Sequence, residues 1–212
     1  MVNVCDIEVM KPLLAVHGFH FSKAKGQNFL IAPWVPESIA RESGVEKDVG
    51  VLEIGPGSGM LTKHLCPHAQ KVLAVEVDHD IIPFLKVNTA AFSNLEIVEG
   101  DIRKQNLREL CGPLGENFLV IANIPYNITT PIFEALWESG LPIRQISVMI
   151  QKEVAEKLMA APSTASYGLM SVKCQYYCTP RLECIVPAEK FTPPPKVTSA
   201  VVRMDIRPTP AV

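Results

Sequence analysis

Short apolar runs alternate with amphipathic segments through the middle of the chain. Apolar runs bounded by glycine or polar residues predict five strands, VGVLEIG (49–55), KVLAVEVD (71–78), NLEIVEGD (94–101), NFLVIANIPY (117–126) and IRQISVMIQ (143–151). Apolar positions at helical spacing predict helices over residues 59–66, 79–92, 130–140 and 152–161. Pro83 falls in the first turn of the second of these helices, where proline is tolerated. This alternation is typical of a parallel sheet covered by helices on both faces.

The pattern changes after residue 166. YGLMSVKCQYYC (167–178) and KVTSAVVRMDI (196–206) both predict strands, and no full helix separates them. The simplest arrangement is an antiparallel pair that closes one edge of the sheet. We therefore expect an α/β fold with a mostly parallel seven-stranded sheet and an antiparallel edge, spanning residues 1–205. Residues 206–212, which end in RPTPAV, are predicted to begin a linker.

The composition fits one domain with a full hydrophobic core. Hydrophobic residues make up 48% of the 212 positions, too many for a disordered chain. No apolar run approaches the ~18 residues that a membrane span needs. The N-terminus, MVNVCDIEVMKPLL, carries acids before its apolar stretch and lacks a signal-peptide cleavage pattern. We therefore expect a cytoplasmic protein with no membrane association.

Neither the cysteines nor the histidines form a metal-site pattern. None of the six cysteines belongs to a C-x-x-C pair. Cys174, Cys178 and Cys184 cluster, but the even spacing of the first two puts them on one face of a predicted strand, which favours reduced core residues. His64 and His68 have i,i+4 spacing, but a proline lies between them and the glutamate of an H-E-x-x-H motif is absent. We expect no metal.

Charge is unevenly distributed, although the formal net charge is only −2. From residue 140 onward there are nine Lys and Arg residues against five Asp and Glu residues; before it there are eleven against seventeen. A basic C-terminal part on an acidic body is compatible with a polyanion docking on one side. Ordinary scatter of surface charge explains the difference equally well.

A glycine-rich loop, LEIGPGSGML (52–61), follows the first predicted strand and opens a helix. Gly55, Gly57 and Gly59 allow a tight turn and close approach of a ligand. The G-x-G-x-G spacing differs from the G-x-G-x-x-G of dinucleotide folds, and no Lys-Ser/Thr pair follows as in a P-loop. The loop therefore points to a ligand other than a pyrophosphate.

Two carboxylates end the next two predicted strands. Glu76 lies 21 residues after Gly55, where it could accept both hydroxyls of a ribose, and Asp101 could accept from the amine of an adenine. Either could instead be a helix cap or a solvated strand end. Together, at successive strand ends beside a glycine loop, they describe an adenosine pocket, and an adenosine without phosphates suggests S-adenosylmethionine.

The sequence also resembles a known family. The glycine loop with Glu76 and Asp101 resembles motifs I to III of Rossmann-like methyltransferases, and NIPY (123–126) resembles motif IV of enzymes that methylate adenine amines. GQNFL (26–30) is similar to the N-terminal cofactor segment of ribosomal-RNA adenine dimethyltransferases. Three further stretches resemble the branch that dimethylates two adjacent adenosines of small-subunit ribosomal RNA: QKEVAEKL (151–158), YGLMSV (167–172) and FTPPPKVTSAVV (191–202).

The resemblance implies roles for individual residues. The catalytic set would be Asn123, Ile124, Pro125, Tyr126 and Phe191. The S-adenosylmethionine set would be Gln27, Asn28, Leu30, Gly55, Gly57, Gly59, Glu76, Val77, Asp101, Ile102 and Asn123. The Asn123 amide oxygen and the Ile124 carbonyl would accept the two N–H bonds of the target amine, with Pro125 restricting the residue before it. Tyr126 and Phe191 would stack on the two faces of a base taken out of its helix.

The implied activity is dimethylation of two adjacent adenosines by a monomer that binds the small ribosomal subunit. Family members usually continue into a helical C-terminal domain that helps engage the particle, so that domain is expected to be missing here. Erythromycin-resistance methylases, which modify one adenosine of large-subunit RNA, also carry NIPY and are the nearest alternative. A non-catalytic RNA- or DNA-binding factor on the same scaffold is another, and a DNA adenine methylase is a weaker one.

Basic residues near the predicted site are candidates for contacts with the RNA backbone. Lys23 and Lys25 flank the cofactor segment, and Lys152, Lys190 and Lys196 lie in the basic C-terminal part. Each is also compatible with an ordinary solvated surface charge.

Overall fold

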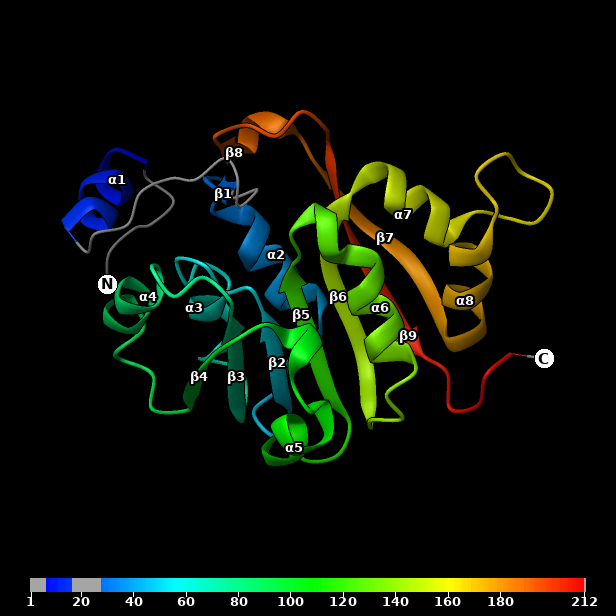
Figure 1. The fold of residues 1–212 in the computed structure, drawn as a ribbon, viewed down its shortest axis with the longest axis horizontal. Coiled ribbons are helices and arrows are strands. Elements are labelled where there is room, and N and C mark those ends of the chain that lie inside the picture. Colours follow the sequence, from blue (N-terminus) through cyan, green and yellow to red (C-terminus); the bar gives the residue numbers. More distant parts are fainter. Residues whose placement is uncertain (1–6, 17–27, 212) are drawn as a thin grey trace.

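The computed structural model describes residues 7–16 and 28–211. Its main sheet has seven strands in the order β4-β3-β2-β5-β6-β9-β7. The first five are parallel, and β9 pairs antiparallel with both β6 and β7. The predicted parallel sheet with an antiparallel edge is confirmed (Figure 1). The strands are β2 (Gly50–Ile54), β3 (Lys71–Glu76), β4 (Leu95–Glu99), β5 (Phe118–Asn123), β6 (Ile143–Gln151), β7 (Cys178–Val186) and β9 (Ser199–Ile206).

Alternate side chains of the central strands enter two separate cores. Val51 and Leu119 face one core, whereas Leu52 and Val120 face the other, because successive strand residues point to opposite faces. The first core is covered by α2 (Trp34–Glu42), α3 (Thr62–Leu65) and α4 (Ile82–Asn88), and α1 (Ile7–Val16) contributes to it. The second is covered by α5 (Leu107–Cys111), α6 (Thr129–Trp137), α7 (Lys152–Met159) and α8 (Leu169–Tyr177).

The segment 167–178 is mostly a helix, so the strand prediction for it was wrong. Helix α8 covers Leu169–Tyr177, and the strand begins only at Cys178. Met170, Cys174 and Tyr177 pack against the second core at i, i+4 and i+7, the spacing of a helical stripe. The helix start is held by Ser171, whose hydroxyl accepts from Gly168 N (3.1 Å) and donates to Lys157 O (2.5 Å).

The prediction that Cys174, Cys178 and Cys184 are core residues assumed that the segment 167–178 is a strand. The predicted burial is nevertheless found for two of the three. Cys174 and Cys178 are both fully buried, on α8 and at the start of β7, whereas Cys184 is half-buried. Burial raises the pKa of the Cys184 thiol, and the neighbouring Glu183 carboxylate adds to that rise. All five cysteines in the described part of the chain are free thiols.

A small second sheet lies above the carboxyl ends of the main strands. β1 (Phe29–Leu30) pairs antiparallel with β8 (Phe191–Thr192), so that Leu30 is opposite Phe191. The bond from Ile31 N to Lys190 O (2.8 Å) extends this pairing. Two predicted site segments that lie 161 residues apart in sequence, at Leu30 and Phe191, are thereby brought side by side (Figure 1).

The remaining predicted helices are present but shorter. Pro83 lies in the first turn of α4, as expected. Single 3-10 turns cover Ile102–Lys104, Gly112–Leu114, Tyr126–Ile128 and Ala188–Lys190. Among the described residues, no helix is both long and apolar enough to span a membrane.

Candidate active site

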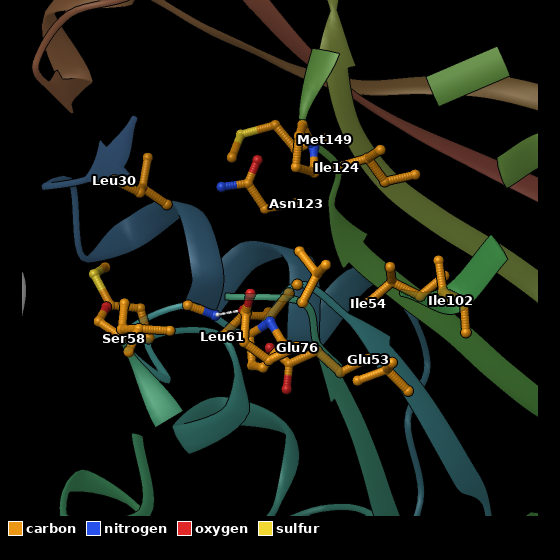
Figure 2. Close-up of a pocket in the computed structure, with 18 of the residues that line it drawn as sticks. Leu30, Glu53, Ile54, Ser58, Leu61, Glu76, Ile102, Asn123, Ile124 and Met149 are labelled. Atoms are coloured by element: carbon orange, nitrogen blue, oxygen red, sulfur yellow. Dashed lines mark hydrogen bonds between the residues drawn. The ribbon is translucent and has the colours of Figure 1, made fainter. Parts of the chain in front are cut away.

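One pocket lies at the carboxyl ends of β2, β3 and β5. The chain leaves β2 toward β3 on one side, whereas β5 lies on its other side, and open α/β sheets bind ligands at such a switch point. Residues of the small β1–β8 sheet and of the end of β6 also line the pocket. Figure 2 shows Glu76, Asn123, Met149 and Leu30 arranged around it.

The glycine loop turns sharply at the end of β2. Gly55 (φ 69°) and Gly57 (φ 55°) have left-handed backbones that favour glycine. Gly55 N donates to Val75 O (2.9 Å), which joins the loop to β3. Gly59 (φ 82°) is not among the residues that line the pocket; a Cβ there would lie 2.9 Å from both Leu85 and Thr89. The structure therefore gives Gly59 a place in the packing of the loop on α4.

Glu76 connects this loop to the end of β3. Its carboxylate accepts from Gly57 N on one oxygen (3.0 Å; Figure 2) and from Asp78 N on the other (2.8 Å). Burial raises the pKa of the Glu76 carboxyl, and the two backbone bonds oppose that rise. Each carboxylate oxygen has a further lone pair, so the group can also accept two ribose hydroxyls. Val77, the next residue, is 61% exposed and lines the pocket.

Asp101 lies just beyond β4, which ends at Glu99, and caps the following 3-10 turn. Its carboxylate accepts from Arg103 N (3.0 Å), Arg103 Nε (2.9 Å) and Arg103 Nη2 (2.6 Å). These bonds to Arg103 lower the pKa of the Asp101 carboxyl. Asp101 is therefore a helix cap, which was one of the alternatives that the sequence left open. It also lines the pocket, and as a carboxylate it can accept further hydrogen bonds there.

The NIPY segment leaves β5 directly into the pocket. Asn123 is the last residue of β5, and Ile124 N donates to Met149 O on β6 (3.2 Å). Pro125 (φ −55°, ψ 131°) follows and starts the turn that contains Tyr126. The hydroxyls of Tyr126 and Ser199 are 2.6 Å apart and hydrogen-bonded. Burial raises the pKa of the Tyr126 phenol, and the bond to Ser199 opposes that rise.

Most of the predicted site residues converge on this pocket. Gln27 lies outside the described residues, and Gly59, although part of the glycine loop, is not among the residues that line the pocket. Phe191 is 3% exposed and lines the pocket from β8. The others that line it are Asn28, Leu30, Gly55, Gly57, Glu76, Val77, Asp101, Ile102, Asn123, Ile124, Pro125 and Tyr126.

Sequence reasoning missed Glu53, a buried carboxyl beside the pocket. Glu53 is 1% exposed, on the face of β2 toward α3. Burial raises the pKa of its carboxyl to about 8; the nearby Thr62 hydroxyl opposes that rise and the Glu76 carboxylate adds to it. No described residue offers a hydrogen bond of good geometry to either Glu53 oxygen or to the Thr62 hydroxyl. The position of Glu53 within the strand, before the glycines, was the available signal.

Among the described residues, no group of three or more histidines, cysteines or acids could hold a metal ion. Lys23 and Lys25 lie outside the described residues. Lys152 pairs with Glu156 (3.5 Å) and Lys190 with Glu189 (3.5 Å), both on the surface, and Lys196 is exposed.

Sheet order, glycine loop and strand-end carboxylates together define a Rossmann-like methyltransferase. The model of the family "Ribosomal RNA adenine dimethylase" matches residues 18–212. Ribosomal RNA small subunit methyltransferase A of Alkaliphilus oremlandii is 41% identical over 214 residues, covering 100% of this chain and 75% of that protein. The chain belongs to the ribosomal RNA adenine dimethylase family, and the predicted family and class of enzyme are confirmed.

Solved structures agree with this assignment. A dimethyladenosine transferase from Plasmodium falciparum has a TM-score of 0.74 and 31% identity, covering 84% of this chain; this chain spans 63% of that one. The 23S rRNA methyltransferase ErmE has a TM-score of 0.77 and 28% identity, and the match covers 87% of this chain and 72% of that one. The domain boundary predicted at residue 205 stays a prediction.

Proposed function

We propose that this chain transfers methyl groups from S-adenosylmethionine to the N6 amines of two adjacent adenosines in small-subunit ribosomal RNA. The observation that carries the proposal is that an adenosine-type cradle and the NIPY segment open into one pocket. The relative of 41% identity, named as a small-subunit methyltransferase, supports this RNA as the substrate.

The residues present fit the cofactor. Glu76, already fixed by two backbone bonds, would hold the ribose hydroxyls, and exposed Val77 would cover one face of the adenine. Asp101 would accept from the adenine amine while Arg103 keeps it ionised. Asn28 and Leu30 would close the other end. The cofactor supplies an activated methyl group, so no metal is needed for the transfer.

Asn123 and Ile124 would hold the target amine. This amine is a poor nucleophile because its lone pair is delocalised into the ring. The Asn123 amide oxygen and the Ile124 carbonyl would each accept one N–H, which favours a pyramidal nitrogen aligned for the transfer. The bond from Ile124 N to Met149 O holds the Asn123–Ile124 peptide, which lies between the two proposed acceptors. Tyr126 and Phe191 would supply the two stacking faces, worth ~1–3 kcal/mol per base.

Methylation of large-subunit RNA is the second candidate, favoured by the likeness to ErmE. The deciding experiment offers unmodified small subunits and unmodified large-subunit RNA to the chain with labelled S-adenosylmethionine, and identifies the product nucleosides by mass spectrometry. We expect N6,N6-dimethyladenosine in the small subunit. Label in the large-subunit RNA alone would favour the second candidate. Cofactor binding without transfer to either RNA would favour a non-catalytic factor.

Asn123→Ala provides the matched test of mechanism. We expect cofactor binding within about tenfold of the parent but a much larger fall in the transfer rate, because the lost bond acts mainly as the nitrogen pyramidalises. Calorimetry measures the first quantity and single-turnover transfer the second. Turnover at the parental rate would remove Asn123 from the mechanism.

A further inference from the structure

A side-chain hydrogen bond joins the two segments that would enclose the substrate base. Tyr126 belongs to the turn that follows NIP, and Ser199 is the first residue of β9. Their hydroxyl oxygens are 2.6 Å apart, and either can donate. The bond spans 73 residues of sequence, and Ser199 is fully buried.

Ser199 ends the segment that begins with the other proposed base contact. Phe191 lies on β8, paired with Leu30 of the cofactor segment, and residues 193–198 connect β8 to Ser199. Thr198, next to Ser199, accepts from Lys152 N through its carbonyl (3.0 Å). Both ends of the Phe191–Ser199 segment are thus held by backbone pairing, and the Tyr126 bond ties the segment to the NIPY turn.

We propose that Ser199 is a positioning residue, whose hydroxyl sets the angle of the Tyr126 ring against which the target adenine stacks. The inference rests on the proposed function. Tyr126 lines the pocket, and its hydroxyl is bonded to Ser199 of β9, which is not among the lining residues. A ring held at one end rotates less about its side-chain torsions, so the base is aligned before the methyl group is transferred.

The backbone pairing of β9 explains its place in the fold without this hydroxyl. Ser199 is opposite Gln151 on β6 and Val186 on β7, so the strand is paired on both sides at that position. The Ser199 hydroxyl is therefore not needed to hold β9 in the sheet. Its hydrogen-bond partner, Tyr126, lines the pocket. A fully buried hydroxyl needs a hydrogen-bond partner in any case, and here that partner is a side chain of the pocket lining.

The test combines four variants. Ser199→Ala and Tyr126→Phe each remove one hydroxyl of the pair, and the double variant removes both. Ser147→Ala is the matched control: Ser147 is also buried and lies on the neighbouring strand β6, its hydroxyl oxygen accepts from Gln145 Nε2 (2.7 Å), and neither residue is among those that line the pocket. Cofactor affinity is measured by calorimetry, and methyl transfer by single turnover on unmodified small subunits at saturating and limiting enzyme.

We expect each single variant of the pair to lower the saturated transfer rate about 3–10-fold, the range for one hydrogen bond, with cofactor affinity changed less than twofold. The double variant should be no slower than the slower single variant, because both remove the same bond. Ser147→Ala should transfer at the parental rate. If Ser199→Ala lowers the melting temperature too far, Tyr126→Phe still tests the bond from its less buried side.

Three results would overturn the proposal: a parental rate in Ser199→Ala, a double variant whose loss is the product of both single losses, or an equal loss in Ser147→Ala. A parent chain that binds the cofactor but methylates neither subunit's RNA would instead overturn the proposed function, and the role of Ser199 in that reaction with it.

Discussion

At the scale of residues, the site depends on carboxylates whose surroundings differ strongly. Glu76 is buried but bonded to two backbone amides, Asp101 is held by Arg103, and Glu53 is buried without a bond of good geometry. The sequence predicted the first two because they follow apolar runs at a strand end. It missed Glu53, since only the packing of α3 over β2 shows that this strand residue is buried.

Glu76→Ala should weaken S-adenosylmethionine binding by about 1–3 kcal/mol, because ribose hydroxyls and the Gly57 amide lose a buried acceptor. Calorimetry measures the change. Glu99→Ala is the matched control, since Glu99 is the register neighbour of Glu76 at the end of β4 but is exposed. Equal affinities of both variants and the parent would take Glu76 out of the ribose site.

Glu53→Gln should change how stability depends on pH. The folded carboxyl keeps its proton until pH about 8, whereas the unfolded one ionises above 4.5. As the pH rises from 4.5 to 8, the unfolding free energy of the parent should therefore fall relative to that of the variant, by at most about 1.4 kcal/mol per pH unit. Below pH 4.5 the carboxyl is protonated in both the folded and the unfolded state, so the difference in unfolding free energy between the two proteins should not change with pH. Urea unfolding at pH 5, 6, 7 and 8 measures this. Parallel curves of unfolding free energy against pH for the parent and Glu53→Gln would contradict the prediction. Glu116→Gln, at an exposed position, is the control, and its curve should run parallel to that of the parent.

At the scale of elements, strand–helix alternation predicted the parallel core, and α8 shows its limit. Over a few residues, the positions of Met170, Ser171 and Cys174 suit a strand or a helix, because the run is short and apolar on more than one face. The bond from the Ser171 hydroxyl to Lys157 O, at the start of α8, joins two segments that only the folded chain brings together. For the same reason the two-residue strands β1 and β8 carry no local signal, although they hold part of the site.

Gly59→Ala should destabilise the junction between the glycine loop and α4. Its left-handed backbone and the 2.9 Å approach to Leu85 and Thr89 both penalise a side chain. Gly140→Ala is the control, with φ 63° but open space around the new methyl group. We expect Gly59→Ala to lose about 1–3 kcal/mol more unfolding free energy than Gly140→Ala in urea titrations. Equal losses would show that only the backbone angle matters.

At the scale of the whole molecule, sheet topology places three lysines of the C-terminal part, Lys152, Lys190 and Lys196, at the same edge of the sheet as the pocket. β6 ends at Gln151, just before Lys152, and β7 runs in the same direction and ends before Lys190. Because β9 is antiparallel to both, the loop with Lys196 that precedes it lies at this same edge. These three lysines are therefore candidates for contacts with RNA that approaches the carboxyl edge of the sheet.

Lys196→Ala should therefore weaken RNA binding and lower its salt dependence. A lysine that neutralises one phosphate releases counterions, so its loss should reduce the slope of log affinity against log salt by about 1. Lys47 is the control: it is also exposed and precedes β2, at the opposite edge of the sheet. Lys47→Ala should leave both affinity and slope at the parental values, measured with small-subunit RNA at several salt concentrations. Equal effects of the two substitutions would mean that the RNA is attracted by overall charge, and that the carboxyl edge of the sheet is not its docking face.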